Sequence, residues 1–375
     1  MKTFNHDRLS LARKRRQLTL RRLGELSGLT PSTLTRLEKG EREPEAKSVQ
    51  KLADVLGYPE DFFYSADLPE LNSDSVSFRS FARMSAAQKH ASEAAGCLGI
   101  ELVEWLDRHF QLPQADLPEM DAGDCASSPE EWALWIRNYW GIGARPIGSM
   151  IDLLEAKGVR VLSMDEETAH VNAFSFWRDD VPYVFLNTYK TAESSVFDAA
   201  HELGHLLMHR EGVVHSDKVR EAEADRFASS FLMPEMDVRA RVQGFVDVPL
   251  ILKNKKRWNV SAFAFARRLK SLGMFFSDDH YRRVCIELTR RGFRKSEPGG
   301  VDRQTSKIWN QVITHLWKNR MTFEDIARQL CLPPDEVQAL IMGLLTPKKP
   351  EQVAEKLPSD YAERRKMFRV LGGDN

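Results

Sequence analysis

The stretch that most restricts the fold of this chain is HELGH, which begins at His201 and ends at His205. Positions four apart on an α-helix lie on one face, so a helix here aims both imidazoles at one point. Two such imidazoles are half of the ligand set that a tetrahedral zinc ion prefers. Glu202 follows the first histidine, where its carboxylate can reach a metal-bound water and exchange protons with it. The stretch therefore predicts a helix that carries a metal site and a general base.

A catalytic zinc also needs a third protein ligand and one open position. Residues 220–234 predict a second amphipathic helix, on which Glu221 and Asp225 are four apart and share a face. This spacing favours Glu221 as the third ligand, and Asp225 as the partner that accepts the other ring N–H of a ligand histidine. Glu223 is the competing ligand, but it points elsewhere on the helix, and we expect it in a surface or inter-helix ion pair.

Two other interpretations of the HELGH histidines are open, namely a helix whose histidines face solvent and a purely structural metal site. The remaining histidines of the region give weaker signals. His209 lies one further turn along, which favours a surface or supporting role over ligation, and His215 is weaker as well. His170 precedes a predicted strand and carries no signal.

A small β-sheet is predicted on the N-terminal side of the metal helix. Helices are expected over 129–140 and 147–157, and a strand follows Gly158. Residues 171–177 and 181–187 flank Arg178-Asp179-Asp180 and predict a hairpin or two adjacent strands. The run 184–187 has two interpretations, which are an edge strand that pairs with an extended substrate and a plain core strand.

The first 66 residues predict a small all-helical domain that contains a helix-turn-helix. Two helices meet at Gly28, where a positive φ is easily adopted, and Gly24 is small enough for the tight crossing of the two helices. Thr30 can cap the second helix and Pro31 suits its first turn. A domain of this kind places its second helix in the major groove of DNA.

The polar side chains around this turn are of the type that contacts base edges and phosphates. The predicted DNA contacts are Arg13 and Arg16 from the first helix, Arg21 and Arg22 from the start of the next, and Ser32, Thr33, Thr35 and Arg36 from the reading helix. The alternative is a helical domain used for dimerisation or for docking a protein partner.

Charge is distributed unevenly along the chain. The 375 residues have a formal net charge of zero, yet residues 1–22 hold eight Lys and Arg against one Asp. A basic face of this kind binds phosphate whatever the whole chain sums to. The four cysteines form no C-x-x-C pair, and neither a signal peptide nor a membrane-length apolar run is present. These features predict a reduced, cytoplasmic setting without a membrane.

Residues 320–345 repeat the pattern of the first helix-turn-helix. Ile326, Ala327 and Leu332 fall where Leu23, Gly24 and Leu29 fall in the first motif. The candidate reading helix of the repeat carries Asp335 and Glu336, and acidic side chains there repel phosphate. We therefore expect a protein-contact or structural role for this region, with a second DNA-reading motif as the alternative.

The overall prediction is a mostly α protein with a small β-sheet. It comprises a helix-turn-helix domain (1–66), a helical connector and linker (67–128), an α+β metal-binding domain with a helical extension (129–299), and a C-terminal helical region and tail (300–375).

Two family resemblances accompany these motifs. Residues 4–63 closely resemble the XRE (lambda-repressor-like) helix-turn-helix family, although Thr19-Leu20-Arg21 stands where that family usually has a phosphate-binding Gln. Residues 130 to about 290, through HELGHLLMH and EAEADRFASSFLMP, resemble the ImmA/IrrE family of zinc-dependent metallopeptidases with a gluzincin-like ligand set.

The second resemblance implies a site-specific protease, commonly one that cleaves a DNA-bound repressor. It implies Zn²⁺ as the cofactor, with Mn²⁺ as the alternative, held by His201, His205 and Glu221, and Glu202 as the general base. The predicted partners are double-stranded operator DNA, a repressor-like protein substrate and a second copy of this chain. Two alternatives are open. One is a transcription factor whose zinc domain is a non-catalytic sensor or dimerisation platform, and the other is a toxin–antitoxin or anti-phage component.

Overall fold

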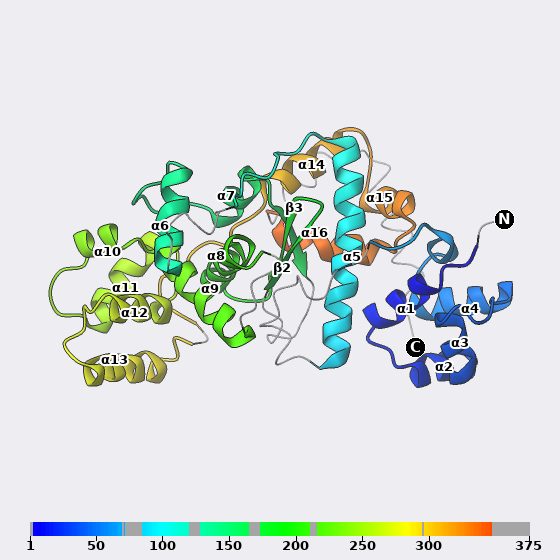
Figure 1. Cartoon of the computed structure of the whole chain (residues 1–375), viewed down its shortest axis with the longest axis horizontal. Coiled ribbons are helices and arrows are strands. Elements are labelled where there is room, and N and C mark those ends of the chain that lie inside the picture. Colours follow the sequence, from blue (N-terminus) through cyan, green and yellow to red (C-terminus); the bar gives the residue numbers. More distant parts are fainter. Residues whose placement is uncertain are drawn as a thin grey trace, which may run out of the picture. The chain divides into compact units, whose positions relative to one another are not determined.

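The structure is a computed structural model of the 375-residue chain, and Met1–Leu344 form one compact unit in it (Figure 1). It describes residues 3–69, 71, 85–119, 128–164, 173–210, 216–294 and 296–346. His170 and His215 lie outside these residues. In the described part of the chain the fold is mostly helical with one three-stranded sheet, as predicted.

The N-terminal domain is all-helical and contains the predicted helix-turn-helix. Its elements are α1 (His6–Arg15), α2 (Leu20–Ser27), α3 (Pro31–Glu38), α4 (Ala46–Leu56) and the 3₁₀ helix η1 (Glu60–Tyr64). Apolar residues spaced at helical periodicity face inward from every element. The centre of this core is formed by Leu9, Leu23, Leu34, Leu52 and Phe62, all of which are fully buried.

The turn between α2 and α3 has the local chemistry expected of it. Gly28 ends α2 in the left-handed region with φ 72°. A Cβ on Gly24 would lie 2.7 Å from the Leu29 carbonyl oxygen, so glycine suits this close approach of the two segments. The Thr30 side chain accepts a hydrogen bond from the backbone N–H of Thr33, and Pro31 opens α3. All four predictions for the turn are confirmed.

The long helix α5 (Ala86–His109) precedes the α+β region, and α6 (Pro129–Tyr139) and α7 (Met150–Ala156) follow it. Both α5 and α6 begin with a capping box, in which the cap serine and the third helical residue exchange hydrogen bonds. Helix α7 begins three residues later than predicted, because the Ser149 side chain accepts from the Asp152 N–H and sets the start there.

The sheet has the strand order β1-β3-β2 and is formed by β1 (Arg160–Met164), β2 (Ala173–Arg178) and β3 (Val181–Asn187). Strand β1 runs parallel to β3, and β2 runs antiparallel to it. The hairpin prediction is confirmed. Its two turn residues, Asp179 and Asp180, have φ values of 46° and 62°, which is the pattern of a two-residue turn of type I′.

The edge-strand interpretation of residues 184–187 is wrong. These residues pair with β1 on one side and three of them, up to Leu186, pair with β2 on the other, so β3 is the middle strand of the sheet. Its backbone groups are committed to both neighbours. The core-strand interpretation is therefore correct, and an extended substrate cannot add to this strand.

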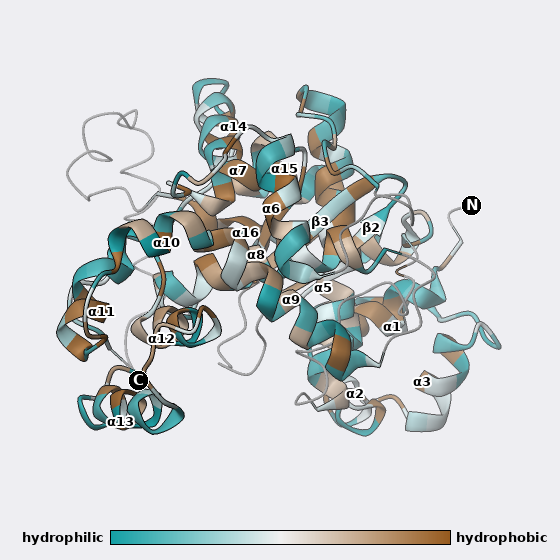
Figure 2. Cartoon of the chain, turned by 60° about the vertical axis from the view of Figure 1, so that its left-hand side comes forward, coloured by the Kyte–Doolittle hydropathy of each residue, from teal (hydrophilic) through white to brown (hydrophobic). Residues whose placement is uncertain are grey.

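Helix α8 (Ala192–Met208) packs beside the sheet, and α9 (Asp217–Leu232) packs closely against α8. Gly204 lets them approach, since a Cβ there would lie 2.9 Å from the Phe227 ring. The chain continues with α10 (Glu235–Arg241), α11 (Val248–Lys255), η3 (Lys256–Trp258), α12 (Ala262–Ser271) and α13 (Asp278–Arg290). Figure 2 shows that α13 carries mainly hydrophilic residues on its outer face.

The C-terminal part of the described chain returns to the sheet. It consists of α14 (Lys307–Lys318), α15 (Phe323–Leu330), α16 (Pro334–Ile341) and η4 (Met342–Leu344). The Ser163 hydroxyl of β1 donates to the Ala339 carbonyl of α16 at 2.7 Å, and the Trp309 indole of α14 donates to the Val161 carbonyl at 2.9 Å. Among the described residues, none of the helices combines the length and the apolar character needed to span a membrane.

Candidate metal centre and nucleic-acid interface

Three side chains from α8 and α9 converge on one point. The Nε2 atoms of His201 and His205 lie 3.1 Å apart. The two Glu221 carboxylate oxygens lie 3.3 Å from His201 Nε2 and 3.2 Å from His205 Nε2. One ligand atom from each residue fits within a span of 4.8 Å. Two imidazole nitrogens and one carboxylate oxygen are a donor set that zinc accepts, so these residues fit the predicted ion.

The surroundings set the charges of this cluster before any metal is considered. Burial lowers the pKa of His201, but hydrogen bonds to Asp225 and Glu221 outweigh burial and raise the pKa to about 10. Burial lowers the pKa of His205 to about 4. Burial raises the pKa of Glu221, but its contacts with both histidines outweigh this and lower the pKa to about 2. The carboxylate is thus ionised at neutral pH.

Asp225 lies where the sequence pattern predicts it. Its Oδ1 is 3.1 Å from His201 Nδ1, the ring nitrogen that points away from the cluster. When His201 Nε2 faces the ligand point, Nδ1 carries the proton and donates it to the carboxylate. A partner of this kind fixes both the tautomer and the orientation of a ligand histidine.

His205 has a longer chain of partners, which joins α8 to α9. Its Nδ1 lies 2.9 Å from His209 Nδ1, and His209 Nε2 lies 3.0 Å from Glu223 Oε2. With His205 Nε2 facing the ligand point, His205 donates to His209 and His209 donates to Glu223, so every ring nitrogen is satisfied. Glu223 was predicted in a surface or inter-helix ion pair; it does bridge the two helices, but through a hydrogen bond from His209, because burial lowers the pKa of His209 to about 4 and leaves the ring neutral.

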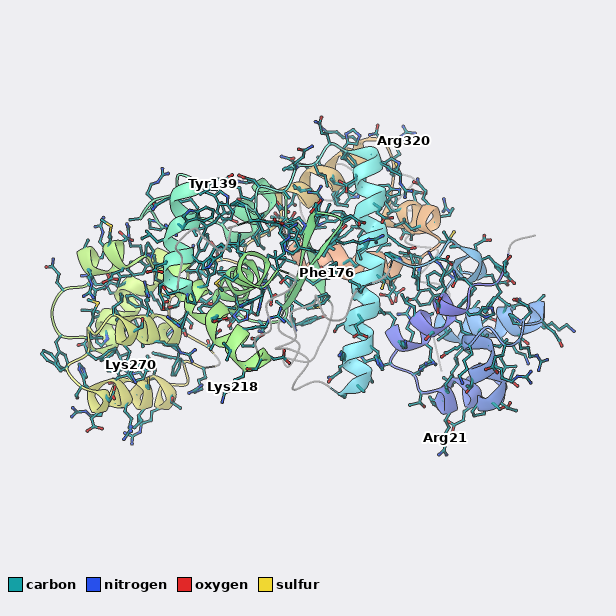
Figure 3. All side chains as sticks on the ribbon, viewed as in Figure 1. Arg21, Tyr139, Phe176, Lys218, Lys270 and Arg320 are labelled. Atoms are coloured by element: carbon teal, nitrogen blue, oxygen red, sulfur yellow. The ribbon has the colours of Figure 1, made fainter. Side chains whose placement is uncertain are left out.

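Glu202 is buried on the same helix as the two histidines. The Ser175 hydroxyl of β2 donates to Glu202 Oε2 at 2.6 Å and so orients the carboxylate. The sequence analysis did not identify Ser175. The one sequence signal for a role of Ser175 is its polar side chain between two aromatic residues of a predicted strand, Phe174 and Phe176. Phe176 is labelled in Figure 3.

The predicted DNA contacts fall into two groups. In the first group, Arg21 and Arg22 have exposed side chains, and each pairs with the exposed Glu25 at 3.1 Å. Arg21 extends away from the domain (Figure 3). Ser32 and Arg36 are also exposed, at the start and on the outer face of α3. These side chains are accessible to a phosphate or a base edge.

Two threonines of the reading helix are half-buried and make local contacts. Thr33 Oγ1 lies 2.9 Å from Thr30 Oγ1, and the Thr35 hydroxyl donates to the Pro31 carbonyl at 2.9 Å. Their hydroxyl groups therefore support the start of α3 as well as lining its surface.

In the second group, the arginines of α1 are engaged by carboxylates. Arg13 donates twice to Glu38, at 2.6 and 2.9 Å. Arg16, which follows α1, donates to Asp335 at 2.7 Å. Contact with a DNA backbone would require both guanidinium groups to leave these partners. The arginines of α2 and α3 are therefore better placed for phosphate than Arg13 and Arg16.

Comparison with known protein families agrees with this arrangement. Residues 9–63 match the family model described as Helix-turn-helix, and residues 154–270 match the Peptidase M78 model, described as an IrrE N-terminal-like domain. No curated protein gives a significant match. The two matched segments contain α2 and α3 in one case and α8 and α9 in the other, so both family resemblances seen in the sequence are confirmed.

Proposed function

We propose that this chain, a helix-turn-helix DNA-binding regulator fused to an IrrE/ImmA-like domain, is a zinc-dependent endopeptidase that cleaves a regulatory protein. The observation that carries the proposal is the convergence of His201, His205 and Glu221 beside Glu202. The match to a peptidase family supports the same chemistry.

His201, His205 and Glu221 would hold the ion, and Asp225 and His209 would hold the two rings in place. When bound, zinc supplies Lewis-acid activation of a water molecule and of the scissile carbonyl. Nitrogen and carboxylate donors also accept Mn²⁺, which is the alternative ion.

Glu202 would act as the general base and then as the general acid. It accepts a proton from the attacking water and later delivers that proton to the leaving amine. Ser175 fixes the position of its carboxylate, and burial keeps bulk water away from it. Proton transfer of this kind depends on geometry first, because donor and acceptor must lie within hydrogen-bond reach.

The DNA-binding domain would bring the peptidase to its substrate. Helix α3 would enter the major groove with Ser32 and Arg36 near the bases and phosphates, while Arg21 and Arg22 contact the backbone. A repressor bound to the same operator would then be held at high effective concentration. Domains of this kind commonly read paired half-sites, so a homodimer is part of the proposal.

The test compares the new protein N-termini in cells that express the wild type, Glu202→Gln or the control Glu235→Gln. Glu235 is an exposed carboxylate on α10 that pairs with Arg239, away from the cluster. We expect a fragment that appears with the wild type and the control but not with Glu202→Gln, while purified Glu202→Gln still binds one zinc ion per chain. Identical fragment profiles for all three proteins would rule out the protease.

The burial of the cluster favours one second candidate, a metal-dependent regulator without catalysis. His201, Glu202 and His205 are all buried. In this case His201→Ala abolishes regulation of a reporter gene, whereas Glu202→Gln leaves it intact. Loss of regulation in both variants, together with loss of a cleavage product, would instead favour the peptidase.

A further inference from the structure

The pair α15–α16 has the same helix lengths and the same turn spacing as α2–α3. Both first helices have eight residues and end at a residue in the left-handed region, which is Gly28 with φ 72° in one and Cys331 with φ 54° in the other. Three residues after this position, both second helices begin with a proline, Pro31 or Pro334, and run for eight residues. The C-terminal helix pair, Phe323–Ile341, is therefore a second helix-turn-helix.

The interior of the two motifs matches as well. Val337 and Leu340 on α16 are buried at the positions that Leu34 and Leu37 occupy on α3. Ile326, Ala327 and Leu332 are also buried, at the positions of Leu23, Gly24 and Leu29. The two motifs therefore bury apolar side chains at equivalent positions. They differ in the polar side chains at the start of their second helices.

The outward side chains at the start of the second helix differ in chemistry. Where α3 presents Ser32 and Thr33, α16 presents Asp335 and Glu336. DNA carries a dense array of negative charge, so two carboxylates at the reading position oppose its approach. The same carboxylates suit a partner that presents guanidinium groups.

The DNA-binding domain of the same chain provides these partners. Glu336 Oε2 accepts from Arg15 Nε at 2.7 Å, and Glu336 Oε1 accepts from the Tyr58 hydroxyl at 3.1 Å. Arg16 Nη1 lies 2.7 Å from Asp335 Oδ2 and 3.2 Å from Glu336 Oε1. The Glu336 side chain is only 3% exposed, and two positive charges balance two negative charges.

We propose that the C-terminal helix pair is a helix-turn-helix that reads protein, and that its reading helix recognises the DNA-binding domain of this chain in place of nucleic acid. Desolvated carboxylates and guanidinium groups are specific for each other, because removal of one leaves the other buried without compensation. The proposal does not depend on peptidase activity.

A neighbouring contact extends the same interface. Arg8 of α1 forms an ion pair with Glu101 of α5, and the Trp105 indole of α5 donates to the Gln329 side chain of α15 at 2.8 Å. The outer side chains of α3 take no part, since Ser32 and Arg36 stay exposed. The docked domain therefore keeps its DNA-reading face open.

Helix α16 also contacts the sheet that precedes the metal helix. The Ser163 hydroxyl of β1 donates to the Ala339 carbonyl. Gly343 packs directly against Thr188, where a Cβ would collide with the threonine hydroxyl, and α8 begins shortly afterwards at Ala192. One short helix thus contacts the DNA-binding domain at its start and the metal-binding domain further along.

The test is a charge-swap cycle in the full-length protein, with hydrogen exchange of the α1 amides as the readout. We expect Arg15→Glu and Glu336→Arg each to speed exchange at least about tenfold, because each buries like charges against each other. The double variant should exchange more slowly than either single variant, since the pair between positions 15 and 336 is restored with reversed sign and Arg16 keeps its contact with Asp335. The control Glu324→Gln changes an exposed carboxylate on α15 and should leave exchange unchanged.

Two results would overturn the proposal. One is a double variant whose exchange rate is the product of the two single effects, which shows that the residues do not recognise each other. The other is wild-type exchange in both single variants. If a charge reversal prevents folding, the milder pair Glu336→Gln and Arg15→Gln replaces it, and the same comparison of single and double variants applies.

Discussion

His209 acts on the candidate metal centre through another residue. It lies directly after α8 and is buried between His205 and Glu223. The four-residue spacing of the histidines is visible in the sequence, but the role of the third one is not. Only the packing of α9 against α8 brings the Glu223 carboxylate to His209 Nε2. The spacing of the histidines within α8 gives no information about this contact between two helices.

The first prediction concerns this relay. His209→Ala should weaken zinc binding about tenfold to a hundredfold, because His205 loses the group that orients its ring. Competition with a chromogenic chelator measures the zinc affinity. His315→Ala, which removes an exposed histidine on α14, is the matched control. An unchanged affinity in His209→Ala would show that the relay does not support the site.

At the scale of single elements, local turn chemistry was predictable and strand order was not. Gly28 and the pair Asp179-Asp180 set their turns through their own backbone preferences, which the sequence displays directly. The position of β3 in the middle of the sheet depends on where β1 lies, and β2 separates the two strands in the sequence. The apolar run 184–187 suits an edge or a central strand equally well, so its neighbours decide.

The second prediction tests the crossing of α2 and α3. Gly24→Ala should destabilise the DNA-binding domain by about 1–3 kcal/mol, because the new Cβ meets a backbone oxygen that cannot move aside easily. Chemical denaturation of the domain and its affinity for operator DNA should both report the change. Gly148→Ala places a Cβ in open space and should have little effect. Equal stability in the two variants would contradict the argument from the crossing.

The third prediction concerns the proposed phosphate contacts. Arg22→Gln should weaken DNA binding by a similar factor on every sequence and reduce the slope of log affinity against log salt by about 1. Fluorescence anisotropy at several salt concentrations gives both quantities. Arg13→Gln should behave differently and lower the stability of the domain, because the Glu38 carboxylate loses the guanidinium group that pairs with it. If Arg22→Gln leaves the slope of log affinity against log salt unchanged, Arg22 does not contact a DNA phosphate.

For the whole molecule, the metal site and the stability of the fold are linked. Two of the proposed ligands come from α8 and the third from α9, so an ion held there would join two helices that are separate in the sequence. Any ligand that binds only the folded state adds to its stability by mass action. The sequence motif predicted His201, His205 and Glu221 as ligands and Asp225 as their partner, while the burial of the histidines and the hydrogen bond from Ser175 to Glu202 emerged only from the packed structure.

The fourth prediction follows from this linkage. Zinc at a hundredfold excess over its Kd should raise the free energy of unfolding by about 2.7 kcal/mol, and a chelator should reverse the gain. Thermal unfolding with and without zinc measures the effect. His201→Ala removes a ligand and should unfold at the same temperature in both conditions. A zinc-dependent shift that persists in His201→Ala would place the ion at another site.

The contacts of helix α16 with protein have a consequence for the identification of DNA-binding motifs in protein sequences. A search for helix-turn-helix patterns scores spacing, glycine-like turns and buried apolar positions, and the C-terminal helix pair satisfies these criteria. A search that scored only these features would count two helix-turn-helix motifs in this chain, whereas the family model reported above matches residues 9–63. The two motifs of this chain differ in the charge of the two side chains that follow the proline, because Asp335 and Glu336 are acidic and contact Arg16 and Arg15. We therefore expect the charge of these two side chains to help distinguish helix-turn-helix motifs that bind DNA from those that bind protein.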